Sequence, residues 1–212
     1  MSVEPTPKLE GRVPPVPTER ETLRTFPTYD LAIGTTVWRV HETDSGPWYF
    51  GDAGRFGLLP KAGTCYVAAD PITTICETVI RGRTHICPAD LASKRIRGLV
   101  TPKLFAIADG TNAIHFGLGR VFGTEVPYDT CREWAAALYE TGFRGIAYWP
   151  SHDPRRGDHL SLALFDAAGE RKKWLRGRAD SLAAPHWQMR IVLETRIAIL
   201  DPPDDDDLDF VE

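Results

Sequence analysis

The chain has few of the features that mark several common classes of protein. Its 212 residues include only four cysteines and two methionines. The cysteines lie 11, 11 and 44 residues apart without a CxxC pair, which excludes a zinc ribbon and a dense disulfide framework. We therefore expect reduced, mostly packed thiols. No apolar run reaches the roughly 18 residues that a membrane-spanning helix needs.

Signals for targeting and for nucleic-acid binding are lacking as well. The N-terminus has no charged stretch leading into an apolar segment and a cleavage site, so we expect a cytoplasmic protein that does not associate with membranes. The formal net charge of −4 hides an asymmetry, because residues 201–212 contain seven acidic residues and no Lys or Arg. Residues 1–200 have 25 basic against 22 acidic side chains, and a net charge of +3 argues against direct nucleic-acid binding.

Composition along the chain predicts one domain with two tails. The hydrophobic share of 42%, with six Trp and nine Phe, is enough for one sizeable core. Residues 1–28 hold six of the 17 prolines among charged residues, which predicts an extended arm. The folded body is expected over residues 29–200, and residues 201–212 are typical of a solvated acidic tail.

Apolar periodicity and turn signals predict a mixed α+β fold with several short strands. The expected helices cover 70–82, which opens with Asp70 as N-cap and Pro71, a short basic stretch at 88–97, and 134–141. The helix expected over 134–141 follows a capping box at 130–133 and ends before Gly142. Strands are expected over 35–41, 64–68, 99–108 with an interruption at Pro102, 143–149, 160–165 and 187–200.

Five side chains stand where a ligand could be bound. Arg39 lies in a strand, Arg55 in a loop rich in Gly and aromatic residues, Tyr66 in the next strand, Glu77 on a helix, and Ser151 at a strand end. Two cations, an aromatic ring and a carboxylate suit a pyrophosphate, a flat heterocycle and a ribose that gains positive charge. The set therefore suggests chemistry on a dinucleotide.

Each of these residues also has a structural explanation. Arg39 could equally form an internal ion pair, and Tyr66 could fill the core. Glu77 precedes Arg81 by four residues, the spacing of a helical surface pair, and Ser151 could cap a turn.

Three familiar motifs are missing around these residues. Ser151 has no GxSxG context, which disfavours a hydrolase nucleophile, and the glycines at 117, 119 and 123 miss the dinucleotide-binding spacing. The cluster of His152, Asp153, Asp158 and His159 matches no zinc motif, so a polar turn is favoured and no metal is predicted.

The order of the segments resembles the RES domain family, which is named for a characteristic arginine, glutamate and serine. The resemblance covers about residues 30–200 and depends on order more than on any one motif. The segments that carry it are 36–40 (TVWRV), 54–56 (GRF), 66–71 (YVAADP), 76–79 (CETV), Thr130 with Trp134 and Ala135, 145–151 (GIAYWPS) and 162–165 (LALF).

The resemblance implies a fold, an activity and a partner. The fold would be similar to that of ADP-ribosyltransferases, with mixed, mostly antiparallel sheets of short strands and flanking helices. The activity would be that of an NAD glycohydrolase or NAD phosphorylase, with NAD as substrate, phosphate as the alternative co-substrate, and neither metal nor further cofactor. Many such proteins are toxins of bacterial toxin-antitoxin pairs, neutralised by an Xre-type antitoxin that blocks the active site.

Position by position, the family's functional residues correspond to Arg39, Arg55, Tyr66, Glu77 and Ser151. The two arginines would anchor the pyrophosphate, Tyr66 would pack on nicotinamide or its ribose, and Glu77 would stabilise the cationic ribose. Ser151 would orient the ribose or the nucleophile. His152 departs from the residue often seen after the serine, and the loop 46–63 is unusually rich in Gly and aromatic residues.

Two other functions are compatible with the same residues. Transfer to a protein side chain would make the chain an ADP-ribosyltransferase, and binding without turnover would make it an NAD or ADP-ribose interaction module. The sequence leaves the acceptor and the oligomeric state open.

Overall fold

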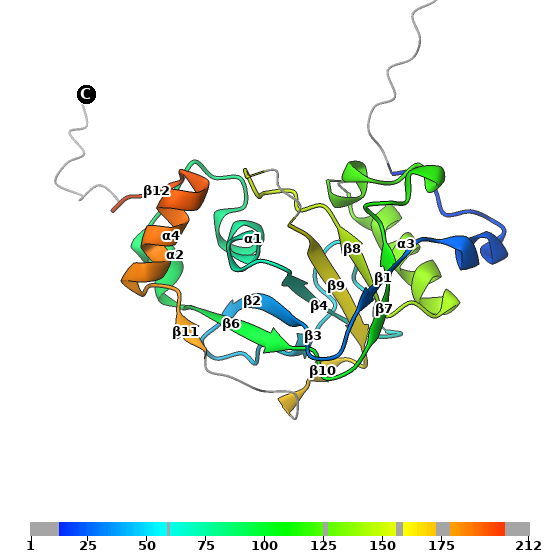
Figure 1. The fold of residues 1–212 in the computed structure, drawn as a ribbon, viewed down its shortest axis with the longest axis horizontal. Helices are drawn as coiled ribbons and strands as arrows, with labels where there is room; N and C mark the ends of the chain where they lie inside the picture. The colour runs from blue at the N-terminus through cyan, green and yellow to red at the C-terminus, as the bar shows by residue number, and fades with distance from the viewer. Residues whose placement is uncertain (1–12, 59, 125–126, 156–158, 173–178, 202–212) are drawn as a thin grey trace, which may run out of the picture.

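A central eight-stranded sheet organises the computed structural model, which describes residues 13–58, 60–124, 127–155, 159–172 and 179–201 (Figure 1). The strand order is β1-β7-β8-β9-β4-β2-β6-β11, and among the described residues only β7 and β8 pair in parallel within it. The strands are β1 Thr28–Leu31, β2 Thr36–Glu42, β4 Gly63–Ala68, β6 Lys94–Val100, β7 Phe105–Asp109, β8 Gly145–Tyr148, β9 Ser161–Asp166 and β11 Asp180–Ser181.

Shorter elements complete the described part of the chain. The helices are α1 Pro71–Ile75, η2 Cys76–Ile80, α2 Pro88–Ala92, α3 Asp129–Thr141 and α4 Pro185–Thr195, with 3-10 turns η1 Arg20–Thr25, η3 Ile114–Phe116 and η4 Arg120–Gly123. Two small sheets pair β3 Tyr49–Phe50 with β10 Gly169–Glu170, and β5 His85–Ile86 with β12 Ala198–Ile199. The predicted α+β class with mostly antiparallel sheets is confirmed. Among the described residues, no helix has the length and apolar character to cross a bilayer.

The two faces of the sheet are covered differently. On one face, inward side chains of β2, β4 and β9 such as Val37, Cys65 and Leu162 pack against Trp48 and Phe50. On the other face, α3 and the segment before β1 cover the β7-β8-β9 half, while α1, η2 and α4 cover the β2-β6 half (Figure 1). Strand β4 lies between these two covered halves, because it pairs with β9 on one side and β2 on the other.

The helix predicted over residues 70–82 is confirmed, with an unexpected change in its second half. Asp70 caps α1 by accepting hydrogen bonds from the backbone of Ile72 and Thr73, both at 3.0 Å. From Cys76 the helix widens into the π-type turn η2, and the N–H of Arg81 closes it on the Cys76 carbonyl at 2.8 Å. Arg81 itself is left-handed, with φ of 49°.

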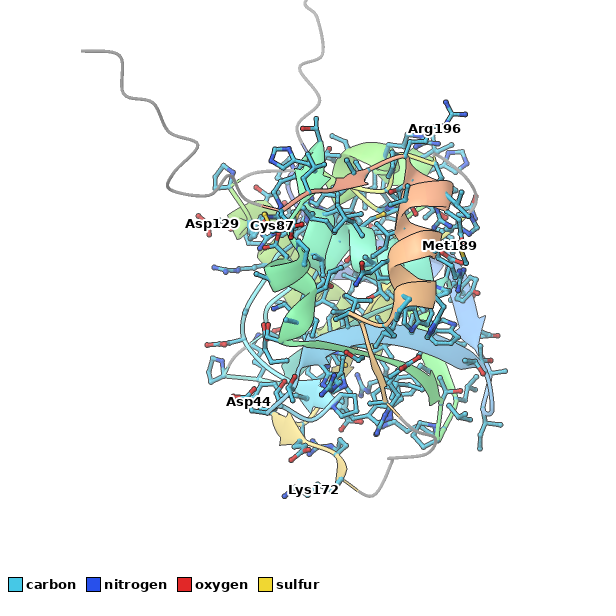
Figure 2. The ribbon with its side chains drawn as sticks, turned by 90° about the vertical axis from the view of Figure 1, so that its left-hand side faces the viewer. Asp44, Cys87, Asp129, Lys172, Met189 and Arg196 are labelled. Atoms are coloured by element: carbon cyan, nitrogen blue, oxygen red, sulfur yellow. The ribbon has the colours of Figure 1, made fainter. Side chains whose placement is uncertain are left out.

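The strand predicted over residues 187–200 is wrong, because most of that segment is helix α4. A strand with Ile191 inside would also bury Leu193 at period two, yet Leu193 is 72% exposed. The buried residues are instead Trp187, Ile191 and Thr195, which recur every four positions as one face of a helix requires. Pro185 at the first helical position supports the same start. Figure 2 shows Met189 on the outer side of this helix.

The extended arm predicted over residues 1–28 needs correction for its described part. Val13, Leu23 and Phe26 are buried in the core beside α3, and the Pro14 carbonyl accepts a 2.7 Å hydrogen bond from the indole of Trp134. These apolar residues outweigh the proline-rich composition around them. Residues 1–12 and the acidic segment 202–212 lie outside the described residues.

Two further predictions were partly wrong. The basic stretch at 88–97 divides into α2 and the start of β6, and α3 begins at Asp129 without the predicted capping box, because no side chain caps it. Its predicted end is confirmed, since Gly142 has a φ of 114°. Pro102 also separates β6 from β7 as expected.

Candidate active site

Tyr66 leaves β4 on the face opposite Cys65, as neighbouring residues of a strand must. Its phenol oxygen accepts a 2.8 Å hydrogen bond from the Phe56 backbone. Gly54 makes this approach possible, because a Cβ there would lie 2.7 Å from that oxygen and its φ is +97°. Burial raises the pKa of Tyr66, so the phenol stays protonated. The hydrogen bond thus fixes the glycine-rich loop against the strand.

Arg55 projects from that loop toward the end of β8. Its Nη2 donates to the Ser151 hydroxyl at 3.4 Å, and its guanidinium lies 5.1 Å from the centre of the Tyr128 ring. Its Nη1 is buried and has no hydrogen-bond partner in the described part of the chain. A buried cationic donor without a partner is costly, and an anionic ligand would satisfy it.

Ser151 follows β8 at the start of a turn. Its hydroxyl donates to the carbonyl of Gly123 in η4 and accepts from Arg55. Gly123 has to be glycine, because a Cβ there would lie 2.1 Å from the carbonyl oxygen of Trp149. The close packing of these two segments therefore sets the position of the serine.

Glu77 lies in the π-type turn η2 and faces the same region. Its Oε1 accepts a 2.6 Å hydrogen bond from the backbone N–H of His152. Burial raises the pKa of this carboxyl, although the His152 and Ser151 amides and the charge of Arg55 oppose the shift. The surface pair with Arg81 that the sequence allowed is not found among the described residues. π-type turns are frequent at functional sites.

Arg55, Tyr66, Glu77 and Ser151 thus form one group, which we call the Glu77 cluster. The phenol of Tyr148 is buried near this group, and burial raises its pKa most, while the charges of Glu77 and Tyr66 raise it further. The pKa of His152 is lowered by burial and by Arg81 and Arg55, so this imidazole is neutral at pH 7. The cluster combines a cation with one unpartnered donor, a hydroxyl, an aromatic ring and one carboxylate.

Arg39 is not brought into this cluster. Its side chain leaves β2 on the face where Cys65 packs, opposite Tyr66. There its Nη1 donates to the carbonyls of Pro47 and Tyr49, both at 2.8 Å. The described geometry therefore supports neither the ion pair nor the ligand contact that the sequence suggested, and shows Arg39 anchoring the chain around β3.

Sequence reasoning missed a second group of polar residues beside the cluster. Asp153, which the sequence placed in a polar turn, binds Arg155 and Thr73, and no group of metal-ligating residues is found among the described residues. Asp158 lies outside them. Only the turn composition of 153–157 pointed to this region, and nothing in the sequence pairs Arg155 with Asp70, 85 residues away.

Comparisons with known proteins bear on the fold and the family of this chain. No curated protein matches the chain. Among solved structures, the toxin-antitoxin complex MbcT-MbcA of M. tuberculosis is similar, with a TM-score of 0.62 and 13% identity over 82% of this chain and 96% of that chain. At this identity the likeness concerns the fold. The RES domain family model matches residues 36–190, a span that contains Arg55, Tyr66, Glu77 and Ser151, and the chain therefore belongs to the RES domain family.

Proposed function

We propose that the protein cleaves the bond between nicotinamide and ribose in NAD and acts as the toxin of a toxin-antitoxin pair. The observation that carries the proposal is the convergence of Glu77, Arg55 and Ser151, which come from three separate segments yet share hydrogen bonds or charge. Membership of the RES domain family supports the same reaction.

Binding of NAD would begin at Arg55. The unpartnered Nη1 supplies a charge-assisted hydrogen bond to the pyrophosphate, which is worth about twice a neutral one. The face of Tyr66 packs on nicotinamide or its ribose, while its hydroxyl stays bonded to the Phe56 backbone. Ser151 then orients the ribose or the incoming nucleophile.

Glu77 would supply the main stabilisation of the transition state. As the C1′–N bond breaks, its electron pair leaves with neutral nicotinamide and positive charge develops on the ribose. A carboxylate held in place by the His152 amide stabilises that charge without reorganising. An oxygen of water or phosphate then bonds to C1′, and the proton it carries is lost to solvent. The pyridinium is already cationic, so departure needs no metal.

Arg39 would act indirectly in this scheme. The pyrophosphate contact predicted for it from sequence would require its side chain to leave the carbonyls of Pro47 and Tyr49. We assign it to holding the chain around β3, and we assign the anion contact to Arg55.

The decisive experiment is product identification after purified protein is incubated with NAD, with and without phosphate. ADP-ribose identifies hydrolysis, and a phosphorylated ADP-ribose formed only with phosphate identifies phosphorolysis. Release of nicotinamide only when a protein acceptor is present would replace the proposal with ADP-ribosyltransfer. Tight NAD binding without any nicotinamide release would replace it with an interaction module.

The toxin assignment has its own test. Induced expression of the wild-type chain should lower cellular NAD and arrest growth, and Glu77→Gln should do neither. Because the similar solved structure is a toxin-antitoxin complex, we propose an Xre-type antitoxin as partner. Co-expression with a candidate antitoxin should restore both NAD and growth.

A further inference from the structure

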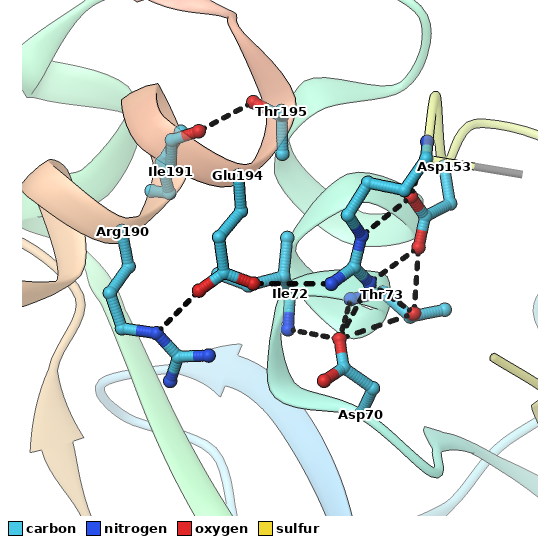
Figure 3. Close-up of polar contacts among 9 residues, drawn as sticks. Asp70, Ile72, Thr73, Asp153, Arg190, Ile191, Glu194 and Thr195 are labelled. Carbon is cyan, nitrogen blue, oxygen red and sulfur yellow. Dashed lines mark hydrogen bonds and ion pairs between the residues drawn. The ribbon is translucent and has the colours of Figure 1, made fainter. Parts of the chain in front are cut away.

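A second polar group lies directly beside the Glu77 cluster, and we call it the Arg155 junction. Its centre is the guanidinium of Arg155, and its other members are Asp70, Thr73, Asp153 and Glu194 (Figure 3). The guanidinium donates to Asp70 at 2.6 Å, to Asp153 at 2.7 and 3.0 Å, and to Glu194 at 3.2 Å. One side chain thus binds three carboxylates.

These carboxylates belong to three separate elements. Asp70 is the N-cap of α1, Asp153 lies in the turn after β8, and Glu194 lies near the end of α4. Thr73 adds a further link, because its hydroxyl donates to Asp153 at 2.7 Å. Arg155 therefore ties the helix start, the turn and α4 to one point.

The centre of the junction is buried. The side chain of Arg155 is 15% exposed and that of Asp153 only 2%. Burial alone would raise the pKa of Asp153, but the hydrogen bonds from Arg155 and Thr73 lower it below its usual range. A planar guanidinium can hold several carboxylates in fixed directions at once, whereas a lysine ammonium acts as a point charge.

The two segments that meet at Arg155 are the segments that build the Glu77 cluster. The turn that contains Asp153 begins with Ser151 and His152, whose amide binds Glu77 at 2.6 Å. The helix that Asp70 caps continues without a break into η2, where Glu77 lies. The distance from Glu77 to Ser151 therefore depends on how firmly the turn is held against the start of α1.

We propose that Arg155 is a positioning residue, which holds the turn of Ser151 and His152 against the helix of Glu77 and so sets the geometry of NAD cleavage. The inference rests on the proposed function. In the described part of the chain, no hydrogen bond joins Arg155 to a residue of the Glu77 cluster. Arg155 therefore acts through Asp70 and Asp153.

The test compares three substitutions in the full-length protein. Arg155→Gln removes both the positive charge and the planar guanidinium that binds three carboxylates. Arg155→Lys keeps the positive charge alone. Arg190→Gln is the matched control. Arg190 donates to the same Glu194 at 2.8 Å, but no described contact joins it to Asp70 or Asp153. Nicotinamide release gives kcat and KM, and thermal unfolding shows which variants are folded at the assay temperature.

A loss in kcat with little change in KM is expected for Arg155→Gln. Misplacing catalytic groups by about 1 Å can reduce a rate on the order of 100-fold, so a loss of that size is expected, with Arg155→Lys intermediate and Arg190→Gln near wild type. The acidic limb of the pH profile should also move to higher pH. The charge of Asp153 raises the pKa of Glu77, and Arg155 no longer offsets that charge in the variant.

Two results would overturn the proposal. One is a folded Arg155→Gln protein with wild-type kcat and pH profile, and the other is an equal loss in Arg190→Gln. If Arg155→Gln does not fold, the kcat and the pH profile of Arg155→Lys alone test the proposal. If wild-type protein releases no nicotinamide, the proposed function fails, and NMR titration of the Glu77 carboxyl in both Arg155 variants still tests the positioning: an unchanged pKa rejects it.

Discussion

Glu77 and Asp153 are carboxylates at one short turn, Glu77 contacting it from η2 and Asp153 lying within it, yet their environments differ in kind. Asp153 is almost fully buried and bound by Arg155 and Thr73, so its pKa is lowered despite burial. Burial raises the pKa of Glu77, and the His152 and Ser151 amides and the charge of Arg55 do not fully offset that shift. A carboxylate whose charge is neutralised by a bound guanidinium stabilises the fold. A carboxylate that lacks such a cationic partner remains available to a cationic ligand.

The largest expected effect is the loss of activity in Glu77→Gln. Removing one preorganised electrostatic group commonly costs about 100- to 1000-fold in kcat, and nicotinamide release should fall by that amount. Gln keeps an oxygen for the His152 amide, so the fold is retained. An activity within threefold of wild type would return Glu77 to a structural role.

The same variant should be more stable than wild type at pH 7. The folded-state pKa of Glu77 is raised, so its contribution to stability is full below the unfolded pKa and is lost as pH rises through the folded value. Gln cannot ionise, so the variant does not lose stability as pH rises. Calorimetry at pH 4 and pH 7 should show a gain in Tm only at pH 7, and a lower Tm at pH 7 would contradict the comparison.

Asp153→Asn should have the opposite effect. Breaking a buried ion pair costs about 3–5 kcal/mol, and because Arg155 keeps Asp70 and Glu194, we expect a loss of roughly 2 kcal/mol at pH 7. The pKa of Asp153 is lower in the folded state than in the unfolded state, where it is about 3.9. The contribution of this carboxylate to stability is therefore full above the unfolded-state pKa and is lost as pH falls through the folded-state pKa. Urea unfolding should therefore show the stabilities of wild type and variant converging as pH falls below about 3.9. A difference that does not depend on pH would contradict this account.

Arg39→Met tests the residue that lies outside the Glu77 cluster. The hydrogen bonds from Arg39 to the carbonyls of Pro47 and Tyr49 and to the Cys65 sulfur are lost, so the free energy of unfolding should fall by about 1.5–3 kcal/mol. KM for NAD should change less than threefold in the folded variant, measured by nicotinamide release. A tenfold rise in KM at unchanged stability would instead support the pyrophosphate contact predicted from sequence.

Local signals in the sequence predicted much of the fold because their causes are local. Asp70 followed by Pro71 predicted the start of α1, and Gly142 predicted the end of α3. The segment of α4 was misread because Ile191 fits both a period of two and a period of four. Only packing shows that Leu193 is exposed.

The candidate site depends on contacts that no local pattern contains. The hydrogen bond from His152 to Glu77 spans 75 residues, and the ion pair of Arg155 with Asp70 spans 85. Family resemblance supplied Arg55, Tyr66, Glu77 and Ser151, which the structure brings together, and also Arg39, which it does not. A family resemblance assigns functional residues by their position in the sequence. It does not give the face of the sheet on which a side chain such as that of Arg39 lies, which depends on the register of its strand.

The smallest expected effect sets the baseline for the comparison. Glu140 pairs with Lys61 on the surface, and the hydrogen bond from that lysine lowers its pKa, the same direction as for Asp153. Both side chains are about half exposed, at 48% and 50%, so Glu140→Gln should cost at most about 0.5 kcal/mol by urea unfolding, and less in high salt. A lowered pKa alone therefore does not make a carboxylate structural. If Glu140→Gln cost as much as Asp153→Asn, burial could not be what gives the Arg155 junction its strength, and the contrast between Asp153 and Glu77 would have to rest on partner charge alone.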